Sequence, residues 1–251
     1  MNPKITDWQG KRVWLVGASS GIGAALAQEL AQRGAKVALS ARNADKLLAL
    51  NISEALILPC DATDVASLAT ARDNLLLAWR GVDLVIYLAG DYQPMRADDF
   101  DLARAERIIE VNFLAAMRLT ASVLPNLKAG GGIAFVASVA GYRGLPKALA
   151  YGPGKAALIH FAEVLHLDLS PKKIGVWVII PGFVATQLTA QNDFTMPALM
   201  TPEAAAIATV DGLKSGKFEI HFPKRFTRFM KFMALLPYRL YFPIIRRTTG
   251  G

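Results

Sequence analysis

The sequence has few cysteines and histidines, and each shortage narrows the chemistry that the chain can perform. Cys60 is the only cysteine among 251 residues, so no internal disulfide can form, and this composition fits a reducing cytoplasm. The three histidines, His160, His166 and His221, are scattered along the chain and form no cluster of metal ligands. We therefore expect a cytoplasmic protein without a metal site.

Long hydrophobic runs are also missing from the sequence. We find no apolar run long enough to cross a bilayer, and the N-terminal residues lack the hydrophobic region of a secretory signal peptide. Hydrophobic residues make up 53% of the chain and charged residues 19%, as in a rather apolar globular protein. The length favours one large α/β domain, which we place at residues 1–222, followed by a tail at residues 223–251.

Acidic residues are absent from residues 220–251, which carry seven Lys and Arg side chains. The formal net charge of the whole chain is +8, so these seven positive charges leave +1 for everything before them. The basicity belongs to the tail, and no nucleic-acid-binding motif accompanies it elsewhere. We therefore expect no nucleic acid among the partners.

The tail has the pattern of a basic amphipathic helix. Phe226, Phe229, Met230 and Met233 recur at helical spacing, and Pro237 then interrupts the pattern. Residues 223–247 suit the headgroup region of an anionic membrane, which would make the protein membrane-peripheral. A lid over a pocket or a pad on a subunit interface fits the same pattern, and the sequence leaves these alternatives open.

Short apolar runs alternate along the chain with segments of helical period. The runs that we expect to be strands span residues 12–16, 36–40, 55–61, 82–88, 132–138, 176–180 and 218–222. The later helices should span residues 65–80, 98–128 with a break near 97–101, 151–169 and 202–214. This alternation predicts an α/β fold, a doubly wound parallel sheet of about seven strands with helices on both faces. Ligands then bind at the carboxyl ends of the strands.

A glycine-rich turn joins the first expected strand to a helix. The turn reads Gly17, Ala18, Ser19, Ser20, Gly21, Ile22 and Gly23. Glycines let the backbone approach a pyrophosphate, and the N-terminus of the helix offers free N–H groups and a positive dipole end. The order of strand, turn and helix favours a dinucleotide phosphate site over a turn without a ligand.

The second expected strand ends at Arg42, with no acidic residue between Ala35 and Ala44. An NAD site usually has an acid here for the ribose 2′-hydroxyl, whereas a guanidinium binds a 2′-phosphate. We therefore predict NADP over NAD, with Ser19 as a second contact. Asp61, at the end of the third run, is placed to meet the adenine edge.

Tyr151 and Lys155 are four residues apart, which puts both on one face of a helix. A nearby ammonium favours the phenolate and lowers the pKa of a tyrosine, so the pair suits proton transfer. Pro153 is tolerated only if the helix begins close to Tyr151. Ser138 ends the fifth run, and Asn112 is an amide in an apolar stretch that needs hydrogen-bond partners.

Together these motifs resemble the short-chain dehydrogenase/reductase family, over residues 10–222 or so, and the resemblance implies a Rossmann-like fold. It implies that Tyr151 is the general acid or base, that Ser138 holds the substrate oxygen, and that Lys155 lowers the phenol pKa and binds the nicotinamide ribose. Asn112 would hold a water of a proton relay. The cofactor-binding residues implied are Gly17, Ser19, Ser20, Gly21, Ile22, Gly23, Arg42, Asp61, Ala62, Ala89, Gly90, Tyr151, Lys155, Pro181, Gly182, Val184 and Thr186.

The sequence departs from the family pattern at two places. Tyr87 and Leu88 stand where the family often has two asparagines, so the bracing of the central sheet is in question. Val16 stands where a threonine is common. Neither change touches the catalytic residues.

We predict an NADP(H)-dependent oxidoreductase that interconverts a carbonyl and an alcohol. The loops at residues 91–98 and 183–199 offer more apolar than charged side chains, which favours a hydrophobic substrate. The family usually forms homodimers or homotetramers. A non-enzymatic dinucleotide sensor and a membrane-associated scaffold on the same fold are the alternatives, although neither needs the Ser-Tyr-Lys set.

Overall fold

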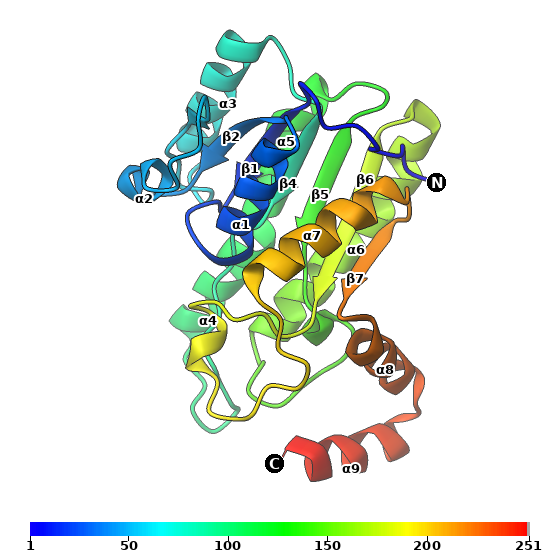
Figure 1. Cartoon of the computed structure of the whole chain (residues 1–251). Helices are drawn as coiled ribbons and strands as arrows, with labels where there is room; N and C mark the ends of the chain where they lie inside the picture. Colours follow the sequence, from blue (N-terminus) through cyan, green and yellow to red (C-terminus); the bar gives the residue numbers. More distant parts are fainter. Residues whose placement is uncertain (250–251) are drawn as a thin grey trace.

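The computed structural model describes residues 1–249 and contains one parallel sheet between two layers of helices (Figure 1). The strands are β1 (Arg12–Val16), β2 (Lys36–Ser40), β3 (Leu56–Ile57), β4 (Leu84–Tyr87), β5 (Gly132–Val136), β6 (Gly175–Pro181) and β7 (Glu219–Phe222). Their order in the sheet is β3-β2-β1-β4-β5-β6-β7. The chain runs outward in one direction from β1 and then in the other from β4, which confirms the predicted doubly wound arrangement and makes the β1/β4 edge the topological switch point.

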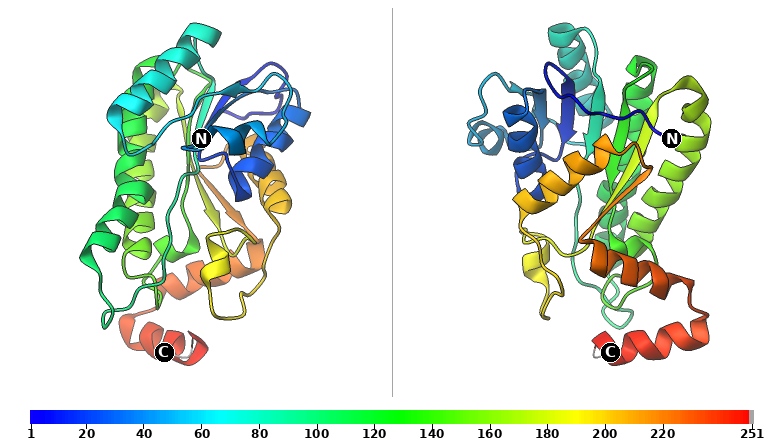
Figure 2. Two further views of the ribbon diagram at one scale, coloured as in Figure 1. Left: turned by 90° about the vertical axis from the view of Figure 1, so that its left-hand side faces the viewer. Right: turned by 45° about the vertical axis from the view of Figure 1, so that its right-hand side comes forward.

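The helices are α1 (Gly21–Gln32), α2 (Ala44–Leu48), α3 (Val65–Trp79), α4 (Leu102–Ile109), α5 (Ala115–Val123), α6 (Tyr151–Leu169), α7 (Pro202–Lys214), α8 (Lys224–Leu235) and α9 (Tyr238–Thr249). Successive side chains of β1 point to opposite faces of the sheet, so the strand contributes to the hydrophobic core on each face. Trp14 packs with α3, α5 and α6, while Leu15 packs with α1 and α7. Figure 2 shows the sheet edge-on between these two layers.

The third strand is shorter than the apolar run at residues 55–61 predicted. Only Leu56–Ile57 form regular pairs with β2, because Pro59 has no N–H to donate. The chain nevertheless continues along β2, since Leu58 N donates to Leu39 O at 2.9 Å and Cys60 N donates to Ala41 O at 3.0 Å. Asp61 therefore still reaches the carboxyl edge of the sheet.

The expected helix at residues 98–128 begins at Leu102, after Asp101 accepts a capping hydrogen bond from Arg104 N at 3.0 Å. Within the described residues, one continuous helical run, Leu102–Asn126, is long and apolar enough to cross a bilayer by length and composition. The prediction that no run has this length is therefore wrong. The run packs on α6 and α3 as a core helix of the fold, because its apolar side faces the sheet.

The tail forms two helices beyond the carboxyl ends of the strands (Figures 1 and 2). α8 buries Thr227, Met230 and Met233, and α9 buries Tyr241 and Ile245. The amphipathic helix and its end before Pro237 are confirmed. Phe229 is the exception to the predicted apolar stripe, because it lies at the edge of the stripe and is exposed.

Candidate functional site

The glycine-rich turn between β1 and α1 is held by contacts of the backbone alone. Gly17 has a φ of +100°, and a Cβ there would lie 2.4 Å from Ala89 N. A Cβ on Gly23 would lie 2.2 Å from Gly17 O, so neither position accepts a side chain. The turn is fixed to β2 because Gly17 N and Ala18 N both donate to Ser40 O, at 2.8 and 3.1 Å. Among the described residues, the Ser20 side chain does not cap α1, so the helix N-terminus keeps N–H groups available for an anion.

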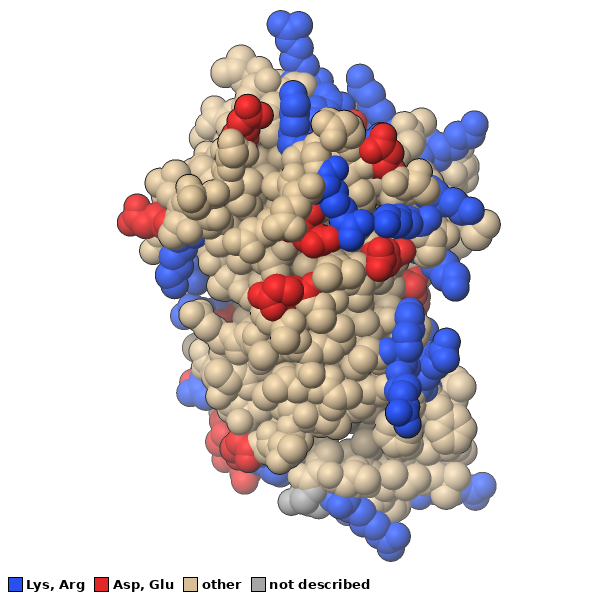
Figure 3. Space-filling view, in the orientation of Figure 1, with Lys and Arg blue, Asp and Glu red and all other residues tan. Residues whose placement is uncertain are grey.

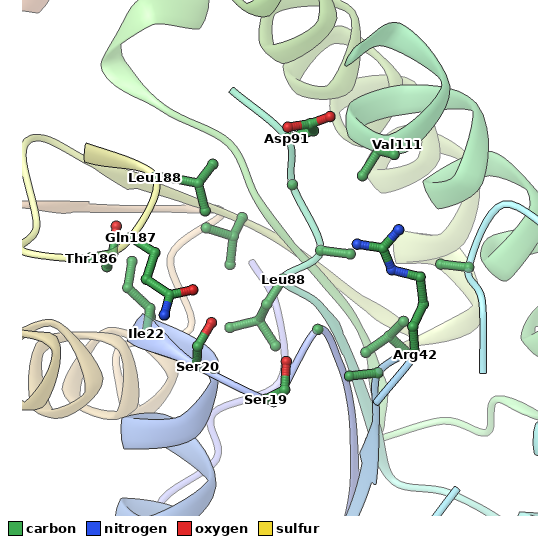
Figure 4. Close-up of a pocket in the computed structure, with 18 of the residues that line it drawn as sticks. Ser19, Ser20, Ile22, Arg42, Leu88, Asp91, Val111, Thr186, Gln187 and Leu188 are labelled. Carbon is green, nitrogen blue, oxygen red and sulfur yellow. The ribbon is translucent and has the colours of Figure 1, made fainter. Parts of the chain in front are cut away.

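A cleft of about 820 Å³ runs along the carboxyl ends of the strands, with this turn in its floor. Ser19 and Ser20 lie on the floor, Arg42 at one end, and Thr186 with Gln187 at the other (Figure 4). Most predicted cofactor residues line it: Gly17, Ser19, Ser20, Ile22, Gly23, Arg42, Asp61, Ala62, Ala89, Gly90, Tyr151, Lys155, Pro181, Gly182, Val184 and Thr186. Gly21 touches the lining instead, since a Cβ there would lie 2.9 Å from Thr186 Cγ2.

Arg42 lies at one end of the cleft together with Asn43 and Lys46, two residues that the sequence analysis did not single out. Asn43 and Lys46 also line this end, and Asn43 caps α2 by accepting from Lys46 N at 3.0 Å. Asp61 accepts hydrogen bonds from Thr63 N at 2.9 Å and Thr63 Oγ1 at 2.7 Å. These bonds hold the pKa of the Asp61 carboxyl below its usual value, and the positive charge of Arg42 acts in the same direction. The end of the cleft thus combines two cations with one carboxylate.

Tyr151 begins α6, and Lys155 follows one turn later, as predicted. The Lys155 side chain is buried, its Nζ donates to Val136 O at 2.9 Å, and the same atom lies 5.6 Å from the centroid of the Tyr151 ring. Ser138 stands just past the end of β5, where its Oγ accepts a hydrogen bond from Ala140 N at 3.2 Å, and it is near enough to the Tyr151 phenol to lower the pKa of that group. Residues thirteen positions apart in the chain thus meet because β5 and α6 end and begin at the same edge.

The glycines that follow Tyr151 allow close packing of the helix start. A Cβ on Gly152 would lie 3.3 Å from Ala140 O, and one on Gly154 would lie 3.3 Å from Ile109 Cδ1. Pro153 falls in the first turn, where its missing N–H has no helical partner to lose. This weak helical segment is therefore stabilised by its neighbours, which compensates for its poor helix propensity.

Burial sets the pKa values of the Tyr151–Lys155 pair in the protein alone. It raises the pKa of Tyr151 to about 12, while the nearby Ser138 hydroxyl acts in the opposite direction. It also lowers the pKa of Lys155 to about 7. A lysine with a pKa near neutrality can give up a proton and take one back at physiological pH.

Asn112 lies in a π-helical turn, Glu110–Leu114, between α4 and α5, and is fully buried. Its Nδ2 donates to Asp91 O at 2.6 Å and to Ile108 O at 2.8 Å. Its Oδ1 has no hydrogen-bond partner among residues 1–249. A Cβ on Gly90 would lie 3.2 Å from this Oδ1 and 3.6 Å from Lys155 Nζ, so both polar atoms face the same point. A buried acceptor without a partner needs a water or ligand donor there.

Tyr87 braces the central sheet at the position where the family often has an asparagine. Its buried ring stands on β4, and its hydroxyl donates to Val111 O at 2.6 Å. Val111 is in the π-helical turn beside Asn112. The tyrosine therefore ties the central sheet to the turn that carries Asn112, and burial raises its pKa so that it stays a donor.

Tyr92 and its partners lie next to Tyr151, and sequence reasoning identified only the loops that carry them. The Tyr92 ring meets the Tyr151 ring edge to face, with 4.9 Å between centroids. Its hydroxyl donates to Asn192 Oδ1 at 3.0 Å, and Gln191 Nε2 donates to Tyr92 O at 2.8 Å. The loops at residues 91–98 and 183–199 are therefore joined next to Tyr151.

Comparison with known proteins gives a consistent result. Residues 11–196 match the family described as short chain dehydrogenase. An uncharacterized oxidoreductase of Myxococcus xanthus is 34% identical over 242 residues, covering 93% of this chain and 95% of that protein. An 11-beta-hydroxysteroid dehydrogenase-like protein of Arabidopsis thaliana is 34% identical over 189 residues, or 72% of this chain and 61% of the relative.

A solved structure extends the similarity to the fold. A short chain dehydrogenase from Burkholderia cenocepacia, in complex with NADP, superposes with a TM-score of 0.78 at 26% identity, over 86% of this chain and 96% of that one. The match along residues 11–196 covers the glycine-rich turn, Ser138, Tyr151 and Lys155 in their expected order. The chain therefore belongs to the short-chain dehydrogenase/reductase family.

Proposed function

We propose that the protein is an NADP(H)-dependent oxidoreductase that interconverts a carbonyl and an alcohol on a hydrophobic substrate. The observation that carries this proposal is the meeting of Ser138, Tyr151 and Lys155 at the wall of a cleft whose floor is a phosphate-binding turn. The cradle at Gly17 and Gly23, which no side chain can enter, fits the pyrophosphate of a dinucleotide. When bound, the dinucleotide supplies or accepts the hydride.

In the reductive direction, the Tyr151 hydroxyl gives its proton to the substrate oxygen, which Ser138 holds by a hydrogen bond. Lys155 restores that proton, which its pKa near neutrality permits. The unpartnered Oδ1 of Asn112 faces Lys155 and holds a water through which the proton is replaced. A positioned general acid of this kind contributes about 10²–10⁴-fold in rate.

Arg42 and Lys46 support NADP(H) over NAD(H). Both line the end of the cleft where the second strand stops, and a guanidinium with an ammonium provides charge-assisted hydrogen bonds for a 2′-phosphate. The similar Burkholderia cenocepacia protein was solved in complex with NADP. Asp61 is engaged by Thr63 and stands beside the adenine end rather than in competition for the phosphate.

A hydrophobic substrate is supported by the lining of the loops above Tyr151. Tyr92 contributes an aromatic ring there, and Phe183 packs against Phe194 at 5.6 Å between centroids. The Arabidopsis thaliana relative is named as a hydroxysteroid dehydrogenase-like protein, and a steroid ketone or alcohol is a hydrophobic substrate.

We also propose a homodimer or homotetramer in the cytoplasm. Met117 on α5 and Leu167 on α6 support the oligomer, because they expose apolar side chains on the outer helical layer.

The test is a screen of hydrophobic ketones for oxidation of NADPH, followed by Tyr151→Phe. The phenylalanine keeps the ring but removes the transferable proton, so kcat should fall by about 10²–10⁴-fold while NADPH still binds. Tyr238→Phe, on the exposed side of α9, is the matched control and should leave kcat unchanged. If Tyr151→Phe turned over at the wild-type rate, the proposed acid would be wrong. Dinucleotide binding without turnover of any ketone or alcohol would favour the sensor alternative.

A further inference from the structure

The outer sides of α8 and α9 expose large apolar side chains. The inner sides are occupied by the packed residues of the two helices, such as Met233 and Tyr241. The outer sides carry Phe229, Phe232, Leu235, Tyr238, Leu240 and Phe242, all about half exposed or more, and we name these residues the tail surface. Large exposed apolar residues concentrated on two consecutive helices indicate a surface that meets a partner or a membrane.

The helices that carry the tail surface contain basic residues and no acidic ones. Residues 220–251 contain seven Lys and Arg and no Asp or Glu. Lys231 pairs with Glu219 on β7 at 2.6 Å, while Arg239, Arg246 and Arg247 are exposed along α9. Figure 3 shows blue side chains and no red ones at the lower right of the molecule, where α8 and α9 lie. The surface is therefore complementary to an anionic layer with an apolar interior.

The tail surface is attached to the segment that joins Ser138 to Tyr151. The Arg143 guanidinium lies 4.5 Å from the Tyr238 ring centroid and 4.3 Å from that of Tyr241. Arg143 also donates to Ala234 O at 2.7 Å and to Leu236 O, and the Tyr241 hydroxyl donates to Gly144 O at 2.7 Å. The junction between α8 and α9 is thus fixed to the segment that connects Ser138 to Tyr151.

The start of α8 also touches the loop that covers the substrate side of the cleft. The Phe226 ring lies 5.6 Å from the Phe183 ring between centroids, and a Cβ on Gly182, which lines the cleft, would lie 2.8 Å from Phe226 Cδ1. A layer lying against the tail surface would therefore be near the loop at residues 183–199, which borders the cleft.

We propose that the tail surface docks on an anionic lipid bilayer and that the enzyme takes its substrate, a ketone or alcohol dissolved in that bilayer, from the membrane. The second part rests on the proposed function. A second copy of the chain is the competing occupant of this surface. It is disfavoured because two such surfaces would bring two sets of unbalanced positive charges together.

The docking is tested by sedimentation of the full-length protein with vesicles of phosphatidylcholine alone or mixed with phosphatidylglycerol. The protein should bind the mixed vesicles and be released by salt. Arg239→Gln with Arg246→Gln should weaken binding about fivefold for each arginine, since each basic residue near an anionic surface is worth about 1 kcal/mol. Phe232→Ser with Phe242→Ser should weaken it further. Leu77→Ser and Lys172→Gln, exposed far from the tail, are the matched controls and should bind like the wild type.

A second measurement separates docking from chemistry. Each variant is assayed on a water-soluble ketone and on a long-chain ketone carried in mixed vesicles, both with NADPH. The tail variants should keep the wild-type rate on the soluble ketone and lose rate on the vesicle-borne one in proportion to their loss of binding. Failure to reduce any ketone would remove the proposed function and leave the sedimentation result to decide docking.

Three results would overturn the proposal. The first is a full-length protein that ignores phosphatidylglycerol vesicles. The second is a tail variant that binds them like the wild type. The third is a tail variant that changes from dimer to monomer in sedimentation velocity without any change in vesicle binding, which would make the tail surface an interface between two copies.

Discussion

The two halves of the cleft are assembled by different kinds of contact. In the dinucleotide half, the contacts are between backbone atoms. Gly17 packs against the backbone of Ala89, and the turn donates two backbone hydrogen bonds to Ser40 O. Around the substrate half, side chains from distant segments meet, as where the Tyr92 ring lies against the Tyr151 ring and the Tyr92 hydroxyl donates to Asn192 Oδ1. Backbone contacts leave no room for an added atom, whereas side-chain contacts can be exchanged one at a time. The first half is therefore built for one constant ligand, and the second can be adapted to a particular substrate.

The largest expected effect tests the backbone contact in the dinucleotide half. Gly17→Ala should lower the free energy of unfolding by about 2–4 kcal/mol, because the φ of +100° strains an alanine and its Cβ would lie 2.4 Å from Ala89 N. NADPH binding should fall with it. Urea unfolding monitored by circular dichroism measures the first effect and fluorescence titration the second.

Gly130→Ala is the matched control, since Gly130 has a φ of +88° and an added Cβ would meet no atom within 4 Å. It should show the cost of strain alone, about 1–2 kcal/mol. Equal losses for the two variants would mean that the contact with Ala89 contributes nothing, and the contrast between the halves would fail at its strongest point.

The next effect concerns Arg42, one of the two cationic side chains that support the proposed cofactor preference. Arg42→Ala should lower kcat/KM for NADPH by about 10–100-fold, since hydrogen bonds to a charged group are worth about 1.5–3 kcal/mol. The value for NADH should stay unchanged. Lys36→Ala, exposed at the other end of β2, controls for a general loss of positive charge. An equal loss with both cofactors would show that Arg42 supports the fold of this half instead of selecting the cofactor.

The same contrast explains what could be predicted from the sequence. The glycine-rich turn, Ser138, Tyr151 and Lys155 were predictable because each reflects a local requirement of the backbone or a fixed spacing along one helix. Tyr92 was not, since its partner Asn192 is 100 residues away and no local pattern links them. Lys46 was missed because α2 has only five residues and too few positions to show a period.

Asn112 was predictable in part. An amide in an apolar stretch predicts burial with hydrogen-bond partners, and the structure confirms both. The π-helical turn around it was not predictable, because the contact of Tyr87 with Val111 O depends on the tertiary fold. The distribution of exposed residues on α8 could not be predicted either. Phe229 and Met230 are both apolar, and only the tertiary packing decides that Met230 faces the core and Phe229 faces outward.

A third, smaller effect tests whether the substrate half can be changed independently. Arg143→Ala removes a guanidinium that holds Tyr238, Tyr241 and Ala234 O, at a cost of about 1–3 kcal/mol in local stability. The KM for a hydrophobic ketone should rise, and the tail should become sensitive to protease, while the affinity for NADPH stays the same. Arg239→Ala, on the exposed side of α9, is the control for loss of charge. An accompanying loss of NADPH affinity would show that the substrate half cannot be changed without affecting the dinucleotide half.

The smallest effect is a pH dependence at the joint between the sheet and the tail. His221, at the end of β7, lies 2.6 Å by its Nδ1 from Thr227 Oγ1 on α8. Burial lowers the pKa of His221 to about 4, and the positive charges of Lys224, Lys231 and Arg228 act in the same direction, with Glu219 opposing them. The imidazole is thus neutral in the folded protein, where a free histidine would have a pKa near 6.5.

The sign of the dependence follows from the lowered pKa. Between about pH 4 and about pH 6.5 the unfolded chain binds more protons than the folded one, so this contribution is fully present above pH 6.5 and is lost as the pH falls toward 4. Because the side chain is partly exposed, the effect should be on the order of a few tenths of a kcal/mol. Hydrogen exchange across this range should show α8 losing protection before α1, and His221→Gln should remove the difference. His160, exposed on α6, gives the control His160→Gln, which should leave it intact. If α1 and α8 lost protection together, the joint at His221 would not separate the tail from the body, and acid would act on the whole fold.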